Sequence, residues 1–113
     1  MITVTRKSFY NCYVHYDENN SIVGYSKPNP ICNSEFHHTD LKGNFVGYSV
    51  KDFGGGYIHY NVNKNIIGRS SKMPFGGYIH YIGNKVAGRS EVMFGGDYRN
   101  CDLTLDIFSD EDK

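Results

Sequence analysis

The sequence YIHYNVNKNIIGRSSKMPFGG, residues 57–77, is followed directly by a close copy of itself, YIHYIGNKVAGRSEVMFGG, residues 78–96. A period near 21 residues is too short for repeats that contain helices, and it fits two strands joined by two turns. Weaker copies extend the repeat, so that its units are about 13–35, 36–56, 57–77 and 78–96, with a degenerate unit at 97–108 and an acidic tail at 109–113. The sequence therefore predicts a single domain of tandem β-hairpins.

Each unit contains the same two strand patterns. The first is aromatic-x-His-Tyr, as in residues 57–60, and the second is apolar-Gly-x-Ser, as in residues 67–70. Phe-Gly-Gly or Pro-containing stretches connect the units, and 13 Gly with 10 Tyr and 7 Phe favour short strands over helices. We expect an all-β, mostly antiparallel meander of four to five hairpins, folded as a curled or sandwiched sheet. Residues 102–107 also alternate as a strand would.

The register of a hairpin follows from counting. If His59 lies opposite Gly68, then Tyr57 lies opposite Ser70, and Tyr60 lies opposite Ile67. A ring that covers a glycine on the facing strand fixes register, so each repeated histidine is first a structural ring. The fourth unit keeps this pairing only with a shorter loop, for which we expect the three residues 83–85.

Neither face of the predicted sheet is plainly polar. A single layer of short strands would leave a partly apolar face in water, and such faces usually mark contacts. We therefore expect the sheet to curl on itself, to pair with a second copy or to bind a partner, and we expect a homo-oligomer.

The repeat resembles that of uncharacterised bacterial β-hairpin repeat proteins. Their units read roughly His-Tyr-Asp, a turn with glycine, Gly-x-Ser and a Gly-Gly link, and residues 15–17 match the first element in full. The resemblance covers about residues 13–96 and implies architecture without a known activity. The chain is also loosely similar to membrane-occupation-and-recognition-nexus repeats, but their usual Tyr-x-Gly spacing is absent, so only the idea of stacked hairpins carries over.

The repeated histidines are the best candidates for chemistry. They are His15, His38, His59 and His80. Equivalent positions in successive hairpins lie two strands apart, roughly 9–10 Å, which is too far for neighbours to share one zinc ion without strong curling. The main expectation is no metal and no cofactor, with a metal-binding or metal-assembled module as an alternative. No catalytic constellation is found, so we expect no enzyme.

An aromatic and basic strip is the best candidate for binding. Tyr25, Tyr48, Arg69 and Arg89 occupy one column of the repeat, and Tyr57 and Tyr78 begin two of its strands. Tyr and Arg are enriched in binding hot spots, although cross-strand packing also explains such a column. Lys plus Arg equal Asp plus Glu at 12 each, so nucleic acid is an unlikely ligand. A carbohydrate-binding module is a further alternative.

Three cysteines without close pairing favour reduced thiols, and the first residues lack the apolar segment of a secretory signal. We therefore expect a cytoplasmic protein with no membrane partner. Together these features predict a non-catalytic module that binds an unidentified protein, as an inhibitor or adaptor that acts by occlusion. An origin in bacteria or phage would fit this size.

Overall fold

A computed structural model describes residues 2–32 and 34–101. Short antiparallel strands make up nearly all of it, with two single 3-10 turns, η1 (Phe9–Asn11) and η2 (Phe94–Gly96). The strands are β1 (Ile2–Lys7), β2 (Tyr13–Tyr16), β3 (Ile22–Pro28), β4 (Glu35–Thr39), β5 (Phe45–Lys51), β6 (Tyr57–Asn61), β7 (Ile66–Lys72), β8 (Tyr78–Ile82), β9 (Lys85–Val92) and β10 (Tyr98–Cys101). The expected strand at 102–107 and the tail at 109–113 lie outside the described residues.

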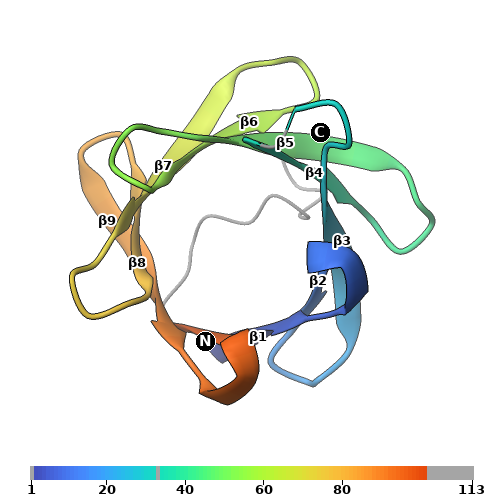
Figure 1. Cartoon of the computed structure of the whole chain (residues 1–113), viewed down its shortest axis with the longest axis horizontal. Helices are drawn as coiled ribbons and strands as arrows, with labels where there is room; N and C mark the ends of the chain where they lie inside the picture. The colour runs from blue at the N-terminus through green and yellow to red at the C-terminus, as the bar shows by residue number, and fades with distance from the viewer. Residues whose placement is uncertain (1, 33, 102–113) are drawn as a thin grey trace.

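The ten described strands close into a barrel in sequence order, with β1 paired to β10 (Figure 1). The all-β antiparallel meander is confirmed, but the prediction of a curled or sandwiched sheet is wrong. Closure occurs because β1 supplies the second strand of the degenerate fifth unit, where Thr5 lies opposite Tyr98 and Thr3 lies opposite Asn100. The barrel therefore has five hairpin units around its axis, and no strand edge is left unpaired among the described residues.

The predicted pairing of histidine with glycine is confirmed in all four hairpins. The Cα partners are His15 and Gly24, His38 and Gly47, His59 and Gly68, and His80 and Gly88. The register shifts immediately after each histidine, so Tyr60 lies opposite Ile66 and not opposite the predicted Ile67. Each second strand thus contains a β-bulge, one residue more than its partner.

The bulge sets which residue of the apolar pair before the glycine is buried. Val46 and Ala87, the second residues of their pairs, are each only 5% exposed. Ile66 and Val86, the first residues of theirs, are 65% and 68% exposed. Val46 and Ala87 are the extra residues of their bulges, so strict alternation is broken there and the side chain directly before the glycine is buried.

Side-chain oxygens stabilise the turns within the hairpins. The Asp17 carboxylate accepts hydrogen bonds from the backbone N–H groups of Asn19 and Ser21, as expected for an Asp that opens a turn. Asp40 and Asn61 do the same in the next two units. The fourth turn has two residues, Gly83 and Asn84, and not the three predicted, because Ile82 and Lys85 are already paired.

The most deeply buried side chains of the barrel are mostly polar. Among the described residues, the buried polar side chains are Ser26, His38, Ser49, Ser70, Ser90 and Asn100, whereas the buried hydrophobic ones are Val46, Ala87 and Cys101. None of the described segments is a helix that is long and apolar enough to cross a bilayer. Hydrogen bonds across the interior therefore take the place that apolar packing has in most small domains.

Candidate functional site

A closed ring of hydrogen bonds runs around the inside of the barrel and takes one side chain from every strand. We call it the polar circuit. Its members, from β1 to β10, are Thr5, His15, Ser26, His38, Ser49, His59, Ser70, His80, Ser90 and Asn100. Neighbouring polar atoms are 2.5–3.1 Å apart around the whole ring, with the last bond joining Asn100 to Thr5.

The sheet register explains why the sequence pairs His with Gly-x-Ser. His38, His59 and His80 each lie directly opposite the serine of the preceding hairpin, and His15 lies opposite Thr5 of β1. Within its own hairpin His59 lies opposite Gly68, two residues before Ser70. Since glycine has no side chain, the imidazole can lean over it, and Nε2 of His59 comes within 2.6 Å of the Ser70 hydroxyl. The glycine leaves the space that lets one ring bridge two serines.

The Asn100 amide determines the direction of the circuit. Its oxygen can only accept, so Ser90 donates its one hydroxyl proton to Asn100 Oδ1. Ser90 must then accept from Nε2 of His80, and the same logic continues around the barrel to His15. Asn100 Nδ2 donates to Thr5, and Thr5 donates to Nδ1 of His15, which closes the ring in the same sense. All four histidines are thus neutral and carry their proton on Nε2.

Burial favours this neutral state. It lowers the pKa of His15, His59 and His80 to about 4, and it lowers the pKa of His38 to about 3. The charges that His15 and His59 would carry add to the effect at His38. An imidazolium has two N–H donors and no acceptor, so protonation of any of the four histidines would also break the hydrogen bond that its Nδ1 accepts.

The circuit also decides what the histidines can bind. A metal ion needs the lone pair of a ring nitrogen, and in the circuit Nδ1 accepts a hydroxyl proton while Nε2 already carries one. Residues 2–32 and 34–101 contain no group of three or more His, Cys, Asp or Glu side chains that could hold a metal ion. A bound metal would therefore require the ring to open, and we expect the circuit to serve structure.

Five aromatic side chains form a second ring one layer from the circuit. This aromatic pentagon comes from every second strand and consists of Tyr13, Phe36, Tyr57, Tyr78 and Tyr98. Ring centroids of neighbours are 5.9–6.5 Å apart, with interplanar angles of 50–74°. Such tilted and edge-to-face contacts are favourable for aromatic pairs. The pentagon lies toward the barrel end that carries the connections between hairpins.

Both rings line one cavity of about 340 Å³. On the side of β1 to β3 the cavity extends past the circuit to Thr3, Asp17 and Val23. No buried side-chain nitrogen or oxygen among the described residues lacks a hydrogen-bond partner. The walls are thus fixed by their own contacts before anything enters.

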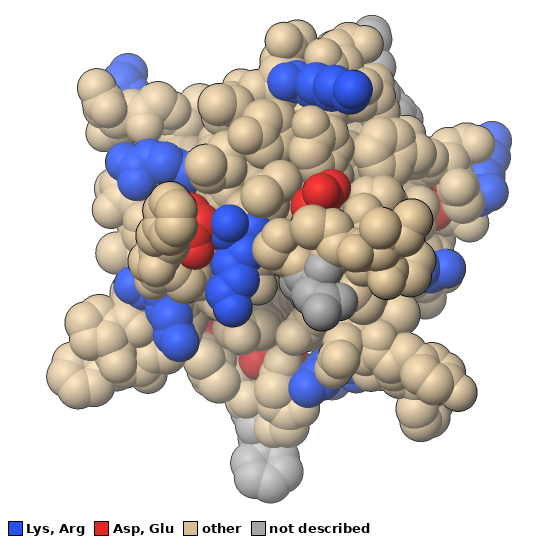
Figure 2. All heavy atoms as spheres, turned by 45° about the horizontal axis from the view of Figure 1, so that its top comes forward, with Lys and Arg blue, Asp and Glu red and all other residues tan. Residues whose placement is uncertain are grey.

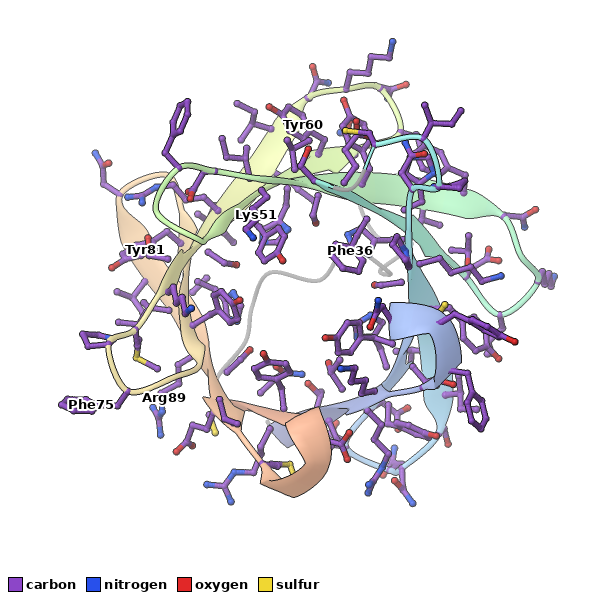
Figure 3. All side chains as sticks on the ribbon, in the orientation of Figure 1. Phe36, Lys51, Tyr60, Phe75, Tyr81 and Arg89 are labelled. Carbon is purple, nitrogen blue, oxygen red and sulfur yellow. The ribbon has the colours of Figure 1, made fainter. Side chains whose placement is uncertain are left out.

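The structure does not bring the predicted binding residues onto one surface. Tyr57 and Tyr78 belong to the pentagon inside the barrel, whereas Tyr25, Tyr48, Arg69 and Arg89 lie on the outer wall, and we call these four the outer strip. Figure 3 shows Phe36 directed into the barrel and Arg89 away from it. On the wall, Tyr48 stacks on Tyr60 at 4.8 Å, and the Arg69 guanidinium lies 4.4 Å from the Tyr81 ring centroid.

Sequence reasoning missed two features. The serine of each Gly-x-Ser element was visible, but its role as the partner of two histidines depends on pairing between hairpins. The apolar residues of the connecting loops were treated only as turns, although their regular recurrence, as in Phe53 and Phe75, was a signal. Both side chains are fully exposed.

Comparison with protein-family models, with curated proteins and with solved structures finds no match to this chain.

Proposed function

We propose that the protein is a non-catalytic module that binds a partner protein through side chains on its outside. The observation that carries this proposal is a set of exposed apolar side chains at one end of the barrel, which we call the apolar crown. Its members are Phe9, Tyr10, Ile31, Phe53 and Phe75, and they are 83–111% exposed. They extend from the connections between hairpins, as Phe75 does in Figure 3.

The crown is positioned by rigid loops. The Asp52 carboxylate accepts hydrogen bonds from the backbone of Gly54 and Gly56, which fixes the loop that bears Phe53. The equivalent loop around Phe75 contains Gly76 and Gly77 at positive φ. Burying one such side chain in a partner contributes roughly 1.5–3 kcal/mol. Several anchors held in place on one rim are typical of a binding surface, since little ordering is left to be done on association.

The outer strip offers further contact positions around the outer wall. Arg and Tyr are the side chains most often found in hot spots, and those of the strip stand on four different strands around the wall. In Figure 2 Lys and Arg are scattered over the face shown and form no continuous stripe. That distribution supports a protein partner over a nucleic acid, whose phosphates favour a basic groove.

Affinity capture from the source cell tests the proposal. The bait would be the full chain, compared with a crown variant, Phe53→Ser with Phe75→Ser, and a strip variant, Arg69→Ala with Arg89→Ala. Val62→Ser is the matched control, because Val62 is an exposed apolar residue in a hairpin turn at the opposite end. We expect a protein that the wild type and the control retain and that the crown variant loses. Equal recovery by all four baits would refute a role for the crown.

Occlusion is tested on the captured protein. If the module inhibits by covering a functional surface, the wild type lowers the partner's own activity and the crown variant does not. An adaptor would leave that activity unchanged and bring a second protein into the complex. Burial of the crown in a second copy would give the homo-oligomer expected from the sequence, and sedimentation of the wild type beside the crown variant distinguishes that case.

A carbohydrate is the second candidate ligand. Phe45, Tyr48 and Tyr60 form a stack of nearly parallel rings on the outer wall, and Phe45 is 45% exposed. Phe45 stands at one end of this stack, and an exposed aromatic face there would suit the apolar face of a sugar ring. A glycan array that responds to the wild type and to the crown variant, but not to Phe45→Ala, would favour this candidate over a protein partner.

A further inference from the structure

The centre of the aromatic pentagon is equally close to all five of its rings. Five centroids about 6 Å apart on a regular pentagon lie about 5 Å from its centre. Aromatic pairs prefer centroid separations of roughly 4.5–7 Å. A planar ring on the barrel axis would therefore contact five aromatic side chains at once, in a layer that already belongs to the cavity.

The size of the cavity suits a molecule larger than one benzene ring. Its volume is about 340 Å³, and a dry protein cavity of about 150 Å³ is enough for benzene. Ligand pockets are commonly about 300–1,000 Å³, lined by aromatic and apolar groups with few polar ones. This cavity lies at the small end of that range, which limits the guest to one ring or two fused rings.

The polar walls restrict the chemistry of the guest. In the circuit each histidine and each hydroxyl already donates its one proton to a neighbour, so a guest that must accept a hydrogen bond from these groups would have to break the ring. Among the pentagon tyrosines, the Tyr78 hydroxyl already hydrogen-bonds with Tyr98. Burial, together with neighbouring phenols and a hydrogen bond with Tyr98, raises the pKa of Tyr78 to about 12. Burial also raises the pKa of Tyr13 and Tyr57, so these three phenols stay uncharged at neutral pH.

Charge at the mouth argues against a cationic guest. Lys7, Lys51 and Lys72 end their strands opposite Tyr13, Tyr57 and Tyr78, and all three lysines are exposed. Figure 3 shows Lys51 on the inner side of its strand. Although a cage of aromatic rings can bind a quaternary ammonium ion, a rim of lysines repels one.

From this geometry we propose that the barrel cavity binds a small neutral aromatic compound, held at the centre of the aromatic pentagon against the uncharged polar circuit. The site is separate from the apolar crown and from the outer strip, so it does not depend on the proposed protein partner.

Two six-membered-ring alcohols of similar size, one aromatic and one saturated, test the site. Phenol and cyclohexanol would be titrated separately into the full chain, followed by calorimetry and by NMR of the aromatic side chains. We expect saturable binding of phenol at least tenfold tighter than that of cyclohexanol, with the largest shifts at Phe36 and the pentagon tyrosines. Benzyltrimethylammonium, the cationic probe, should bind at least tenfold more weakly than phenol.

Two variants of one strand locate the site. Tyr57→Leu removes a ring of the pentagon and should weaken phenol binding at least fivefold, whereas Tyr60→Leu, on the outer face of the same strand, should leave it unchanged. If Tyr57→Leu fails to fold, the wild-type NMR shifts decide. No saturable binding of phenol, equal affinity for cyclohexanol, tighter binding of the cation, or shifts confined to Tyr48 and Tyr60 would each overturn the proposal.

Discussion

Replacing Ser70 by alanine tests the polar circuit most directly. Ser70 is 2% exposed, and its hydroxyl accepts from Nε2 of His59 and donates to Nδ1 of His80, both at 2.6 Å. The alanine fits the same space but leaves one donor and one acceptor without a partner. Each buried group left so costs about 1–3 kcal/mol, so we expect Ser70→Ala to lower the free energy of unfolding by about 2–6 kcal/mol.

The next residue in the same strand provides the control. Ser71 faces outward, and its hydroxyl only accepts a long bond, 3.4 Å, from the exposed Arg69 guanidinium. Ser71→Ala should change the free energy of unfolding by less than about 0.5 kcal/mol. Urea titration followed by circular dichroism measures both variants. At this chain length the loss expected for Ser70→Ala lowers the melting temperature by roughly 10 °C or more. If the two variants are equally stable, the circuit does not hold the barrel together.

Three further predictions follow from the same structure. The four histidines of the polar circuit have pKa values of about 3–4 in the folded state, below the ordinary 6.5, so the unfolded chain binds more protons below pH 6.5. As the pH is lowered from 6.5 to 4, the free energy of unfolding should therefore fall by up to about 1.4 kcal/mol per pH unit for each histidine. Urea titrations that give the same free energy of unfolding at pH 7 and pH 5 would contradict neutral buried rings. Nitrogen NMR of the imidazoles should show the Nε2–H tautomer at His15, His38, His59 and His80, and a single Nδ1–H signal among them would show that the circuit does not run in one sense. A Cβ at Gly56 would overlap the Ser70 carbonyl oxygen, whereas a Cβ at Gly54 would lie 3.7 Å from its nearest neighbour, the Asp52 carboxylate. Gly56→Ala should thus lower the melting temperature strongly, and Gly54→Ala should hardly change it. Similar melting temperatures for both variants would count against the tight contact between this loop and β7.

Repetition made the local pairing predictable. Because a histidine and a glycine such as His59 and Gly68 recur in each of the four hairpins, one pairing was predicted for all of them. The structure has this pairing up to the histidine, after which the register shifts. The bulge at Ile67 was not predictable from alternation, since a period of two assigns a face to every residue and leaves no room for an extra one. In β5 the equivalent extra residue is Val46, and Val46 is buried whereas Phe45 is exposed.

Closure and the circuit depend on contacts between units, which the repeat alone does not specify. The segment at Thr3–Thr5 lacks the motif of the other units, and only its pairing with β10 shows that it completes the fifth one. The link between Ser49 and His59 likewise joins two neighbouring hairpins. The predicted pairing of Tyr57 with Ser70 already places Tyr57 on the opposite face from Arg69. Which of the two faces becomes the inside depends on the bend that closes the sheet.

The junction between β1 and β10 gives the barrel an uneven folding problem. Every other strand pair joins neighbours in the chain and can form after a short conformational search. In contrast, β1 must find β10, whose Cys101 pairs with Ile2 although the two are far apart along the chain. Loop-closure entropy makes that encounter the least favourable one, although its cost rises only slowly with length. We expect assembly to proceed as a zipper of hairpins that stays incomplete until the two ends meet, and hydrogen exchange should report this junction as the first place to open.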